Sequence, residues 1–448
     1  MATTMKKLFG IIVAVTLVTI ISTIFMNDKP GRFFLQYSGI LAISVMSIAM
    51  ILATRPRWLE NFLGGLDKGY HLHKWLGITA FCAAIFHWLQ SEFPELFGGG
   101  DGEDGDEEHN EGEEEGSFSL SEIDFSSPEN FLESFESPAH TYGELAFYAL
   151  IILILIALIK FIPYRYFAKT HKVIPIAYLA LVFHGIVLMK FDYWSTMAGV
   201  ITAILMIAGS VSAILTLFGM KGRSLRTRAT VINVKEYPKM DAVEVTVKPE
   251  GKWHGHKSGQ FAFLTLNKNK EPHPFTISSS WNENDPKITF TIKALGNFTK
   301  KLKDNVTSGD LITIEGAYGH FNFEDNNQRQ IWISGGIGVT PFLSRLEHLA
   351  QNQEDKQIDF FFLAKDVDAE LMKRITILSK DANVTLHSYT NSTSGHFSYS
   401  ELRNIIPDWI KSSIWFCGPK GLGDILYQDL RQNGLSKDSF HREIFDLR

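Results

Sequence analysis

The stretch HLHKWLGITAFCAAIFHWL, from His71 to Leu89, determines how the first half of the chain is interpreted. Its apolar residues suit a membrane, yet it contains three histidines. An ionisable side chain inside a membrane span is costly without a partner, so such residues mark functional sites. The stretch therefore predicts a membrane helix that binds something through His73 and His87, which are 14 residues apart.

The composition separates two halves of the chain. Nearly all long apolar runs of the 448 residues lie before Met220, and the sequence from Lys221 onward has the mixed pattern of a soluble α/β protein. The formal net charge of −6 argues against a nucleic-acid partner. The only two cysteines, Cys82 and Cys417, exclude a disulfide framework and a cysteine-ligated iron–sulfur cluster.

Six apolar segments have about the 20 residues that a membrane helix needs. They are predicted at about 8–26, 33–53, 71–91, 143–162, 173–190 and 196–219. Lys and Arg concentrate in alternate loops, which places both termini and the soluble half in the cytoplasm. The first segment lacks a small-residue cleavage site, so we interpret it as a membrane helix rather than a signal peptide.

A loop of about 93–140 is expected on the opposite side of the membrane. It contains the acidic run GGGDGEDGDEEHNEGEEEG over residues 98–116. This composition favours a solvated, disordered loop. The alternative is weak capture of metal cations before reduction, which deletion of the loop and a measurement of ferric-chelate affinity would test.

The fifth segment also offers two histidines, His171 and His184, which are 13 residues apart. At 1.5 Å per residue, each histidine pair spans about 20 Å along its helix. Because the third and fifth segments run in the same direction, His73 and His171 share an inner depth, and His87 and His184 share an outer depth. The pattern predicts two bis-histidine sites stacked across the membrane.

Two imidazoles without a thiolate suit a low-spin b-type haem, because neutral imidazole nitrogens bind iron well. Copper and zinc are alternatives, although zinc prefers four ligands. On an ideal helix, 14 residues return to within about 40° of the starting direction, whereas 13 leave about 140°. A kink at Pro175 is expected to absorb part of that offset. His71 competes with His73, but its spacing of 16 to His87 turns those two onto nearly opposite faces.

The soluble half divides into two patterns. Short β-branched and aromatic runs such as AVEVTVKPE and KITFTIKAL predict a small antiparallel barrel. From about Gln330, strands alternate with helices, which predicts a parallel sheet with crossover helices. We therefore expect three domains, at residues 1–220, 221–325 and 326–448.

Four motifs follow one another in this half: HPFTIS at 273–278, LGNFTKKL at 295–302, SGGIGVTPFLS at 334–344 and FCGP at 416–419. A glycine-rich turn between a strand and a helix lets the backbone approach a pyrophosphate and directs helix N–H groups at it. Each motif alone also fits an ordinary turn or strand, but the set in this order is far more specific.

Six spans, paired histidines on the third and fifth, and these motifs resemble the ferric reductase and NADPH oxidase superfamily, most closely its compact bacterial members. The soluble half resembles the ferredoxin–NADP reductase type of module. The resemblance implies a membrane all-α six-helix haem-binding bundle, an antiparallel β-barrel FAD domain and an α/β parallel-sheet NAD(P)-binding domain, in a bacterial inner membrane.

The resemblance also implies site residues. His273 would face the FAD phosphates, Phe275 the flavin ring or its ribityl chain, and Thr276 the reactive ring edge. Lys293 is a candidate second cation, because His273 stands where many soluble members have Arg. The other implied FAD residues are Pro274, Ile277, Ser278, Gly296, Asn297, Phe298 and Thr299.

For the nicotinamide nucleotide, the resemblance implies a pyrophosphate loop and a nicotinamide-side motif. The loop comprises Gly335, Gly336, Ile337, Gly338, Val339, Thr340 and Pro341, and the second motif comprises Cys417, Gly418 and Pro419. Phe445 is the candidate aromatic that covers the flavin face. Thr276, Cys417 and Phe445 are thus the expected residues at the reacting rings. Lys365 and Arg345 are candidate contacts for a 2′-phosphate, and the choice between NADPH and NADH stays open.

The implied activity passes electrons from cytoplasmic NAD(P)H through FAD and two b-type haems to an acceptor outside. His73 and His171 would hold the inner haem, and His87 and His184 the outer one. We expect oxygen, giving superoxide, ahead of a ferric chelate as the acceptor. Two other readings are a haem-membrane subunit that feeds a periplasmic partner protein and a bare membrane anchor for a soluble flavin reductase.

Overall fold

The computed structural model describes residues 2–24, 30–97, 123–159, 161–162, 164–266, 269–390 and 397–443. The chain forms two compact units. The helical unit comprises Met1–Leu63 and Lys68–Lys221, and the soluble unit comprises Gly64–Asp67 and Gly222–Arg448. Most of the acidic loop lies outside the described residues, so its predicted disorder stays a prediction.

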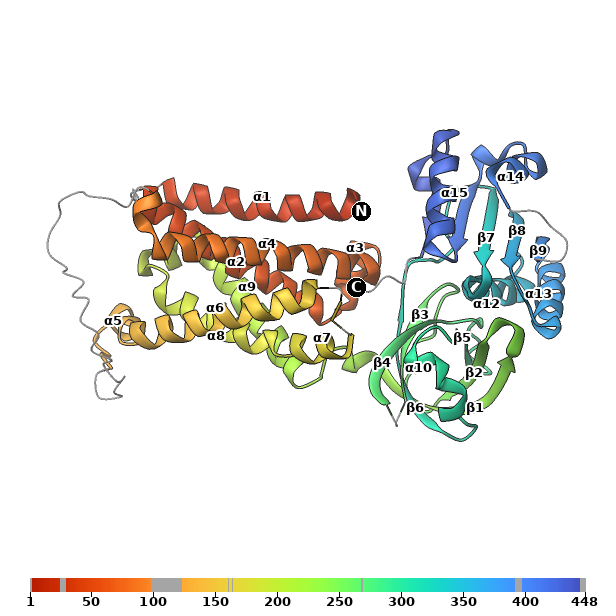
Figure 1. Ribbon diagram of the computed structural model, residues 1–448, viewed down its shortest axis with the longest axis horizontal. Helices are drawn as coiled ribbons and strands as arrows, with labels where there is room; N and C mark the ends of the chain where they lie inside the picture. The colour runs from red at the N-terminus through yellow and green to blue at the C-terminus, as the bar shows by residue number, and fades with distance from the viewer. Residues whose placement is uncertain are drawn as a thin grey trace. The chain divides into compact units, whose positions relative to one another are not determined.

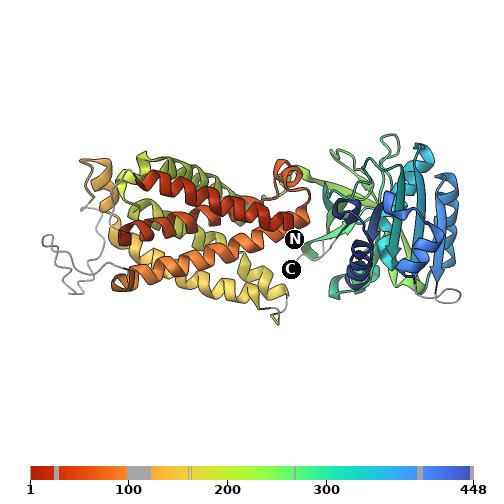
Figure 2. The same cartoon turned by 90° about the horizontal axis from the view of Figure 1, so that it is seen from above.

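Each segment predicted as a span overlaps a long helix (Figures 1 and 2). These helices are α1 (Ala2–Ile24), α2 (Pro30–Ala53), α4 (Leu66–Glu92), α6 (Glu136–Leu158), α8 (Ile174–Leu188) and α9 (Met197–Leu217). Shorter helices are α3 (Arg57–Leu63), α5 (Pro128–Glu133) and α7 (Tyr164–His171). The long helices run side by side, with α2 packed against α1, α8 and α9, and α6 packed against α8.

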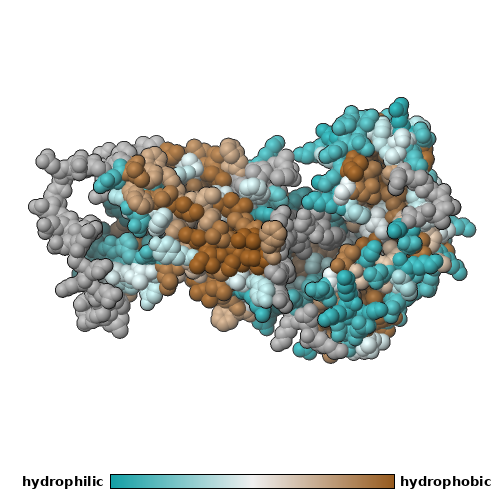
Figure 3. Space-filling view, viewed as in Figure 1, coloured by the Kyte–Doolittle hydropathy of each residue, from teal (hydrophilic) through white to brown (hydrophobic). Residues whose placement is uncertain are grey.

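Four stretches in the described part of the chain are long and apolar enough to cross a membrane: Phe33–Ala53, Glu136–Leu158, Lys169–Leu188 and Met197–Leu217. The apolar part of α1, Phe9–Ile21, is shorter, and α4 is the least apolar of the long helices. Large apolar side chains such as Ile152, Ile176 and Ile204 face outward. Figure 3 shows the resulting brown surface over the helices. Such a surface suits lipid, because soluble proteins rarely expose a large apolar patch.

The first part of the soluble unit is a closed antiparallel sheet in the order β4-β3-β6-β1-β2-β5. Its strands are β1 (Arg226–Tyr237), β2 (Ala242–Pro249), β3 (Phe261–Leu266), β4 (Asn269–Thr276), β5 (Ile288–Lys293) and β6 (Leu311–Tyr318). A bridge between Ile277 and Phe290 joins the two edges and closes the barrel. Alternating inward residues such as Val231, Val245 and Ile314 fill its interior.

The second part is a five-stranded parallel sheet in the order β11-β10-β7-β8-β9. Its strands are β7 (Arg329–Gly335), β8 (Gln357–Ala364), β9 (Thr385–Thr390), β10 (Ser413–Cys417) and β11 (Phe440–Arg442), and its helices are α12 (Thr340–Gln351), α13 (Ala369–Asp381), α14 (Tyr399–Ile405) and α15 (Lys420–Gln432). The first strand, β7, is central, so the strand order reverses between β7 and β10. Ligands of such sheets bind at the carboxyl ends of the strands beside this reversal.

The barrel and the parallel sheet share one hydrophobic core. Tyr237 and Met240 from the end of the barrel pack with Trp332 and Phe342 of the second part. A buried ion network reinforces this junction, since Arg374 on α13 binds both Glu244 of β2 at 2.6 Å and Glu347 of α12 at 2.7 Å. These contacts hold the two parts of the soluble unit together.

Candidate functional site

The inner histidines meet across two helices. The rings of His73 on α4 and His171 at the end of α7 have centroids 6.0 Å apart. His171 and His184 lie on either side of a helix interruption near Pro175, where the sequence predicts a kink. A two-residue turn at 172–173 ends α7, and α8 begins at Ile174 with Pro175 in its first turn. Because of this interruption, the side-chain directions of His171 and His184 need not differ by the roughly 140° expected on one continuous helix.

The outer histidines meet in the same way. The rings of His87 on α4 and His184 on α8 have centroids 6.5 Å apart. Their Nδ1 atoms lie 3.0 Å from the carbonyl oxygens of Leu35 and Ala139, respectively. Because a carbonyl oxygen can only accept, each Nδ1 must carry the proton, and the lone pair of each ring is at Nε2.

A similar bond orients one inner ring. His73 Nδ1 donates to the carbonyl oxygen of Ala49 at 2.9 Å, whereas His171 Nδ1 is buried with no hydrogen-bond partner in the part of the chain that the structure describes. His87 has a second neighbour, because Ser38 Oγ lies 3.1 Å from its Nδ1 and donates to Gln90 Oε1 at 2.9 Å. Such contacts fix the tautomer and the direction of a metal-binding imidazole.

Two glycines make room for the outer rings. A Cβ atom at Gly143 of α6 would lie 2.1 Å from His184 Nδ1, and one at Gly39 of α2 would lie 3.1 Å from His87 Cε1. The outer imidazoles therefore fit against bare backbone. His71, the competitor of His73, instead lies with its ring 6.4 Å from that of Trp75.

These donor sets fit a haem. Imidazole nitrogens bind first-row metals at about 2.0 Å, so two rings on opposite sides of one metal ion have centroids about 6 Å apart. Within the described ranges, no group of three or more His, Cys, Asp or Glu side chains forms a metal site. Two protein ligands leave zinc short of its usual four, whereas a haem already supplies four ring nitrogens.

The flavin motif forms an aromatic cluster on the barrel. His273 and Phe275, two residues apart on β4, lie on one face, and the ring of Phe298 stacks on His273 at 3.8 Å and on Phe275 at 6.3 Å. His273 Nε2 is buried with no hydrogen-bond partner among the described residues. Burial lowers the pKa of His273, opposed by Glu271, so the ring offers a neutral N–H rather than a charge.

The neighbouring motif residues have more local roles. Thr276 is 8% exposed at the end of β4, whereas Ile277 and Ser278 are fully buried. Ser278 Oγ donates to the carbonyl oxygen of Thr289 at 3.1 Å. In GNFT, the Thr299 hydroxyl accepts the N–H groups of residues 295 and 296, both at 2.9 Å, which shapes the turn before the short helix α10 (Asn297–Lys300).

The two glycine motifs pack directly on each other at the carboxyl ends of β7 and β10. Cys417 is paired with Ser334, and Gly336 has φ of +56°. A Cβ at Gly338 would lie 2.1 Å from the carbonyl oxygen of Cys417, and one at Gly335 would lie 2.6 Å from Pro419. Only glycine fits at these points. The motifs thus flank the strand-order reversal, where such a sheet binds its nucleotide.

The other predicted loop residues continue into α12. Ile337 and Val339 join the shared core, and Thr340 and Pro341 open the helix, with Thr340 Oγ1 donating to the carbonyl of Ile337. Cys417 is 4% exposed, and burial together with Glu443 raises the pKa of its thiol well above its usual value. The thiol is therefore neutral at physiological pH.

Three predicted residues need separate comment. Phe445 lies outside the described residues, and its flavin-covering role stays a prediction. Lys293 ends β5, which contacts the glycine turn at Gly336–Val339. Arg345 is bound to Glu354, which lies just before β8. It is therefore at the amino ends of the strands, away from the nucleotide edge, whereas Lys365 directly follows the carboxyl end of β8.

Sequence reasoning missed the groups that hold these residues in place. The GNFT motif contained Phe298, so its stacking on His273 had a signal in the sequence. Gly39, Gly143 and Ser38 had none, because each meets its histidine from a distant part of the chain.

Two families match the chain. Residues 38–182 match "Ferric reductase like transmembrane component", and residues 226–341 match "FAD-binding domain". The first match contains three of the four paired histidines, His73, His87 and His171, and ends two residues before His184. The second contains the aromatic cluster on β4 and the glycine turn.

Curated relatives match parts of the chain. A flavohemoprotein of Oceanobacillus iheyensis is 28% identical over 34% of this chain and 40% of its own length. The propane 2-monooxygenase reductase component of Rhodococcus jostii is 25% identical over 51% of this chain and 65% of its own length. Respiratory burst oxidase homolog protein E of Arabidopsis thaliana is 28% identical over 45% of this chain and 23% of its own length. The chain thus spans less than two thirds of each of these relatives.

A solved structure, the FAD/NAD-binding domain of nitric oxide dioxygenase from Vibrio cholerae, aligns at 19% identity and a TM-score of 0.43 over 49% of this chain and 98% of that one. The family matches and the curated relatives carry the assignment. A ferric reductase-like transmembrane component and an FAD-binding domain matched on one chain show a membrane-associated flavin oxidoreductase that is similar to the ferric reductase and NADPH oxidase superfamily.

Proposed function

We propose that the protein carries electrons from cytoplasmic NAD(P)H through FAD and two b-type haems to an acceptor on the other side of the bacterial inner membrane. The observation that carries the proposal is the meeting of His73 with His171 and of His87 with His184, at 6.0 and 6.5 Å. FAD accepts electron pairs from NAD(P)H and releases them singly, as haem iron requires.

In this proposal, residues of the soluble unit position the two cofactors. The backbone of Gly335–Val339 would hold the NAD(P)H pyrophosphate, because it combines bare glycines with the start of α12. His273 Nε2 would bond an FAD phosphate, and the N–H groups of Asn297 and Phe298 would add donors. Cys417 would line the nicotinamide side as a neutral thiol, which packs without attacking the ring.

In the helical unit, the Nε2 atoms of the four histidines would bind the iron ions. The backbone acceptors at Leu35, Ala49 and Ala139 keep the protons on Nδ1 and so keep Nε2 free. The two pairs lie about 20 Å apart along α4, and two haems held there would let an electron cross the insulating layer in two shorter steps. Six spans and cytoplasmic termini remain part of this proposal.

Oxygen is the acceptor that we favour, giving superoxide. The similarity to a plant respiratory burst oxidase homologue supports it. The ferric reductase-like family match supports a ferric chelate as the second candidate. A periplasmic partner protein is a third outcome, which would show as NAD(P)H turnover that depends on that partner.

Difference spectra of matched histidine variants test the proposal. In the purified chain with FAD and NADPH, we expect reduced b-type haem bands in the wild type. His87→Ala and His184→Ala should each lose about half of the haem and all transmembrane electron transfer, with flavin reduction intact. His140→Ala is the control, because this exposed imidazole lies 6.1 Å from the ring of His184. His71→Ala is the corresponding control for the inner pair.

The results separate the candidates. Absence of a Soret band in the wild type would leave only a membrane-anchored flavin reductase. Unchanged electron transfer in His87→Ala would refute the assignment of the outer pair. Superoxide dismutase suppresses cytochrome c reduction if oxygen is the acceptor, and leaves ferric-chelate reduction unchanged if iron is.

A further inference from the structure

A half-open cavity of about 790 Å³ lies in the soluble unit, away from the nucleotide edge of the sheet. Its lining comes from the segment before β3, from Trp281, from the link between β6 and β7, from α12 and from the loop that follows it. Glu354 and Lys356 of that loop directly precede β8, so the cavity lies at the amino ends of the parallel strands. Its size is that of a small-molecule site.

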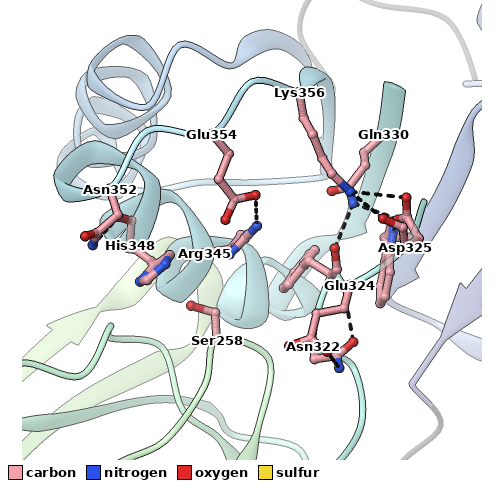
Figure 4. Close-up of polar contacts among 12 residues, drawn as sticks. Ser258, Asn322, Glu324, Asp325, Gln330, Arg345, His348, Asn352, Glu354 and Lys356 are labelled. Atoms are coloured by element: carbon pink, nitrogen blue, oxygen red, sulfur yellow. Dashed lines mark hydrogen bonds and ion pairs between the residues drawn. The ribbon is translucent and has the colours of Figure 1, made fainter. Parts of the chain in front are cut away.

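Arg345 lines the cavity beside Glu354 (Figure 4), and one of its hydrogen-bond donors has no partner among the described residues. Arg345 is 8% exposed, and its guanidinium lies 5.7 Å from the ring of Phe323. Nη2 donates to Glu354 at 2.6 Å, but Nε is buried without a hydrogen bond to any described residue. A buried unsatisfied N–H is costly, and the guanidinium fork is suited to a carboxylate or phosphate.

His256 supplies an acceptor. Its Nε2 lies 2.8 Å from the carbonyl oxygen of Ser279, so Nε2 must carry the proton and Nδ1 the lone pair. Nδ1 is buried and has no partner within the described ranges. Burial lowers the pKa of His256 to about 4, which keeps the ring neutral at physiological pH. Its ring centroid is 5.6 Å from that of Trp281, a flat apolar surface beside the acceptor.

The remaining charges of the lining cancel. Lys257 binds Glu324 at 2.7 Å, and Lys356 binds Asp325 at 3.3 Å. Burial and Arg345 lower the pKa of His348, opposed by Glu354, so this ring adds no positive charge at neutral pH. The cavity therefore suits one negative group rather than a polyanion.

We propose that this cavity binds a small organic anion with one carboxylate or phosphate group, a planar body and a separate hydrogen-bond donor. The anion occupies Arg345 Nε and Nη2 and displaces Glu354, whose side chain is 36% exposed and can turn to solvent. The planar body lies by Trp281, and the donor reaches His256 Nδ1. None of these residues belongs to the flavin or nucleotide motifs, so the site is a second ligand site on the reductase half.

Titration calorimetry on the purified full-length chain with FAD bound tests this inference. The probe is 4-hydroxybenzoate, which carries the anion, the ring and the donor. Benzoate lacks the donor, and 4-hydroxybenzamide lacks the anion. We expect 4-hydroxybenzoate to bind about tenfold more tightly than either, which is the size of effect that one charge-assisted or neutral hydrogen bond produces.

Four variants assign the contacts. Arg345→Lys keeps a cation but loses the fork, and should weaken both benzoates about tenfold. His256→Phe should remove the preference for 4-hydroxybenzoate over benzoate. Glu354→Gln removes the competing carboxylate and should tighten binding, which keeps the test decisive if Arg345→Lys fails to fold. Arg442→Lys is the control, because Arg442 pairs with Asp424 outside the cavity.

Equal binding of all three probes would overturn the inference. So would the absence of binding heat up to about 10 mM probe, which is ten times a Kd of ~1 mM. Water would then be the occupant of the cavity. An unchanged affinity in Glu354→Gln overturns the proposed role of Arg345. Because binding is measured without electron transfer, the inference fails or holds independently of the proposed haem function.

Discussion

Gly143→Ala is the sharpest test of the outer site, because it adds one methyl group beside a proposed ligand. The new Cβ would lie 2.1 Å from His184 Nδ1, while an ordinary contact begins at 3.4 Å, so the ring has to move by more than about 1 Å. Metal–ligand distances tolerate only about 0.2 Å. The move also breaks the bond from His184 to the carbonyl of Ala139. We therefore expect loss of the outer haem alone.

A graded series of glycines controls this prediction. Gly39→Ala brings a methyl to 3.1 Å from His87, which needs a shift of only a few tenths of an ångström. It should keep both haems with a perturbed spectrum. Gly77 of α4 has nothing within 4 Å of its added Cβ. Gly77→Ala should leave the haem content unchanged and gain up to about 1 kcal/mol in helix stability.

The assay is haem per FAD in the purified chain, by pyridine haemochrome. Gly143→Ala should fall to about half of the wild-type ratio, Gly39→Ala should stay near it, and Gly77→Ala should match it. A full haem content with an unshifted Soret band in Gly143→Ala would refute the reasoning. In that case His184 would either not bind iron or not need the space that Gly143 leaves beside its ring.

Three further predictions concern the soluble unit. The first two are measured by the temperature at which FAD is released, and the third by the rate of cysteine alkylation. Arg374→Met leaves the buried Glu244 without its partner and should cost about 3 kcal/mol, visible as a lower release temperature. Hydrogen bonds from Ser413 and Trp415 and the charge of Lys356 outweigh desolvation and lower the pKa of Asp325. The Asp325 carboxylate therefore stabilises the folded unit above the unfolded pKa of about 3.9, and this stabilisation is lost as pH falls through the pKa of the folded state. The drop in FAD-release temperature caused by Asp325→Asn should be constant from about pH 7 to 5 and should shrink below about pH 4. Cys417 should resist iodoacetamide at about pH 8 until the chain unfolds, because its buried thiol stays protonated; rapid alkylation of the folded protein would contradict this.

The helical fold was readable from the sequence because apolar length is a local property. Each predicted span contains or overlaps a helix, although α4 begins at Leu66 and α6 at Glu136, several residues before the apolar runs. In both helices, the α-helical backbone thus begins before the apolar part. The alternation of strands and helices after Gln330 was equally local, and the parallel sheet follows it.

The sites were only partly readable. The motifs placed glycines at Gly335 and Gly338, and the structure gives them a packing reason in the contact with Cys417 and Pro419. Arg345 was a wrong candidate for the nucleotide edge, because a residue five positions into α12 has already travelled toward the other end of the sheet. That direction depends on topology, which a motif does not contain.

The break between α7 and α8 gives the last prediction, because it separates the two histidines of the fifth span. His171 takes its direction from α7 and His184 from α8, with the turn at 172–173 between them. Pro175 supports the break, since it lacks an N–H and its ring clashes with the carbonyl four residues before it. Pro175→Ala should let the helices join, turn His171 away from His73 and cost the inner haem, while the outer pair keeps its contacts. Haem per FAD should then fall to about half, and combination with Gly143→Ala should remove nearly all haem. A full haem content in Pro175→Ala would mean that packing of α7, and not the proline, sets the direction of His171.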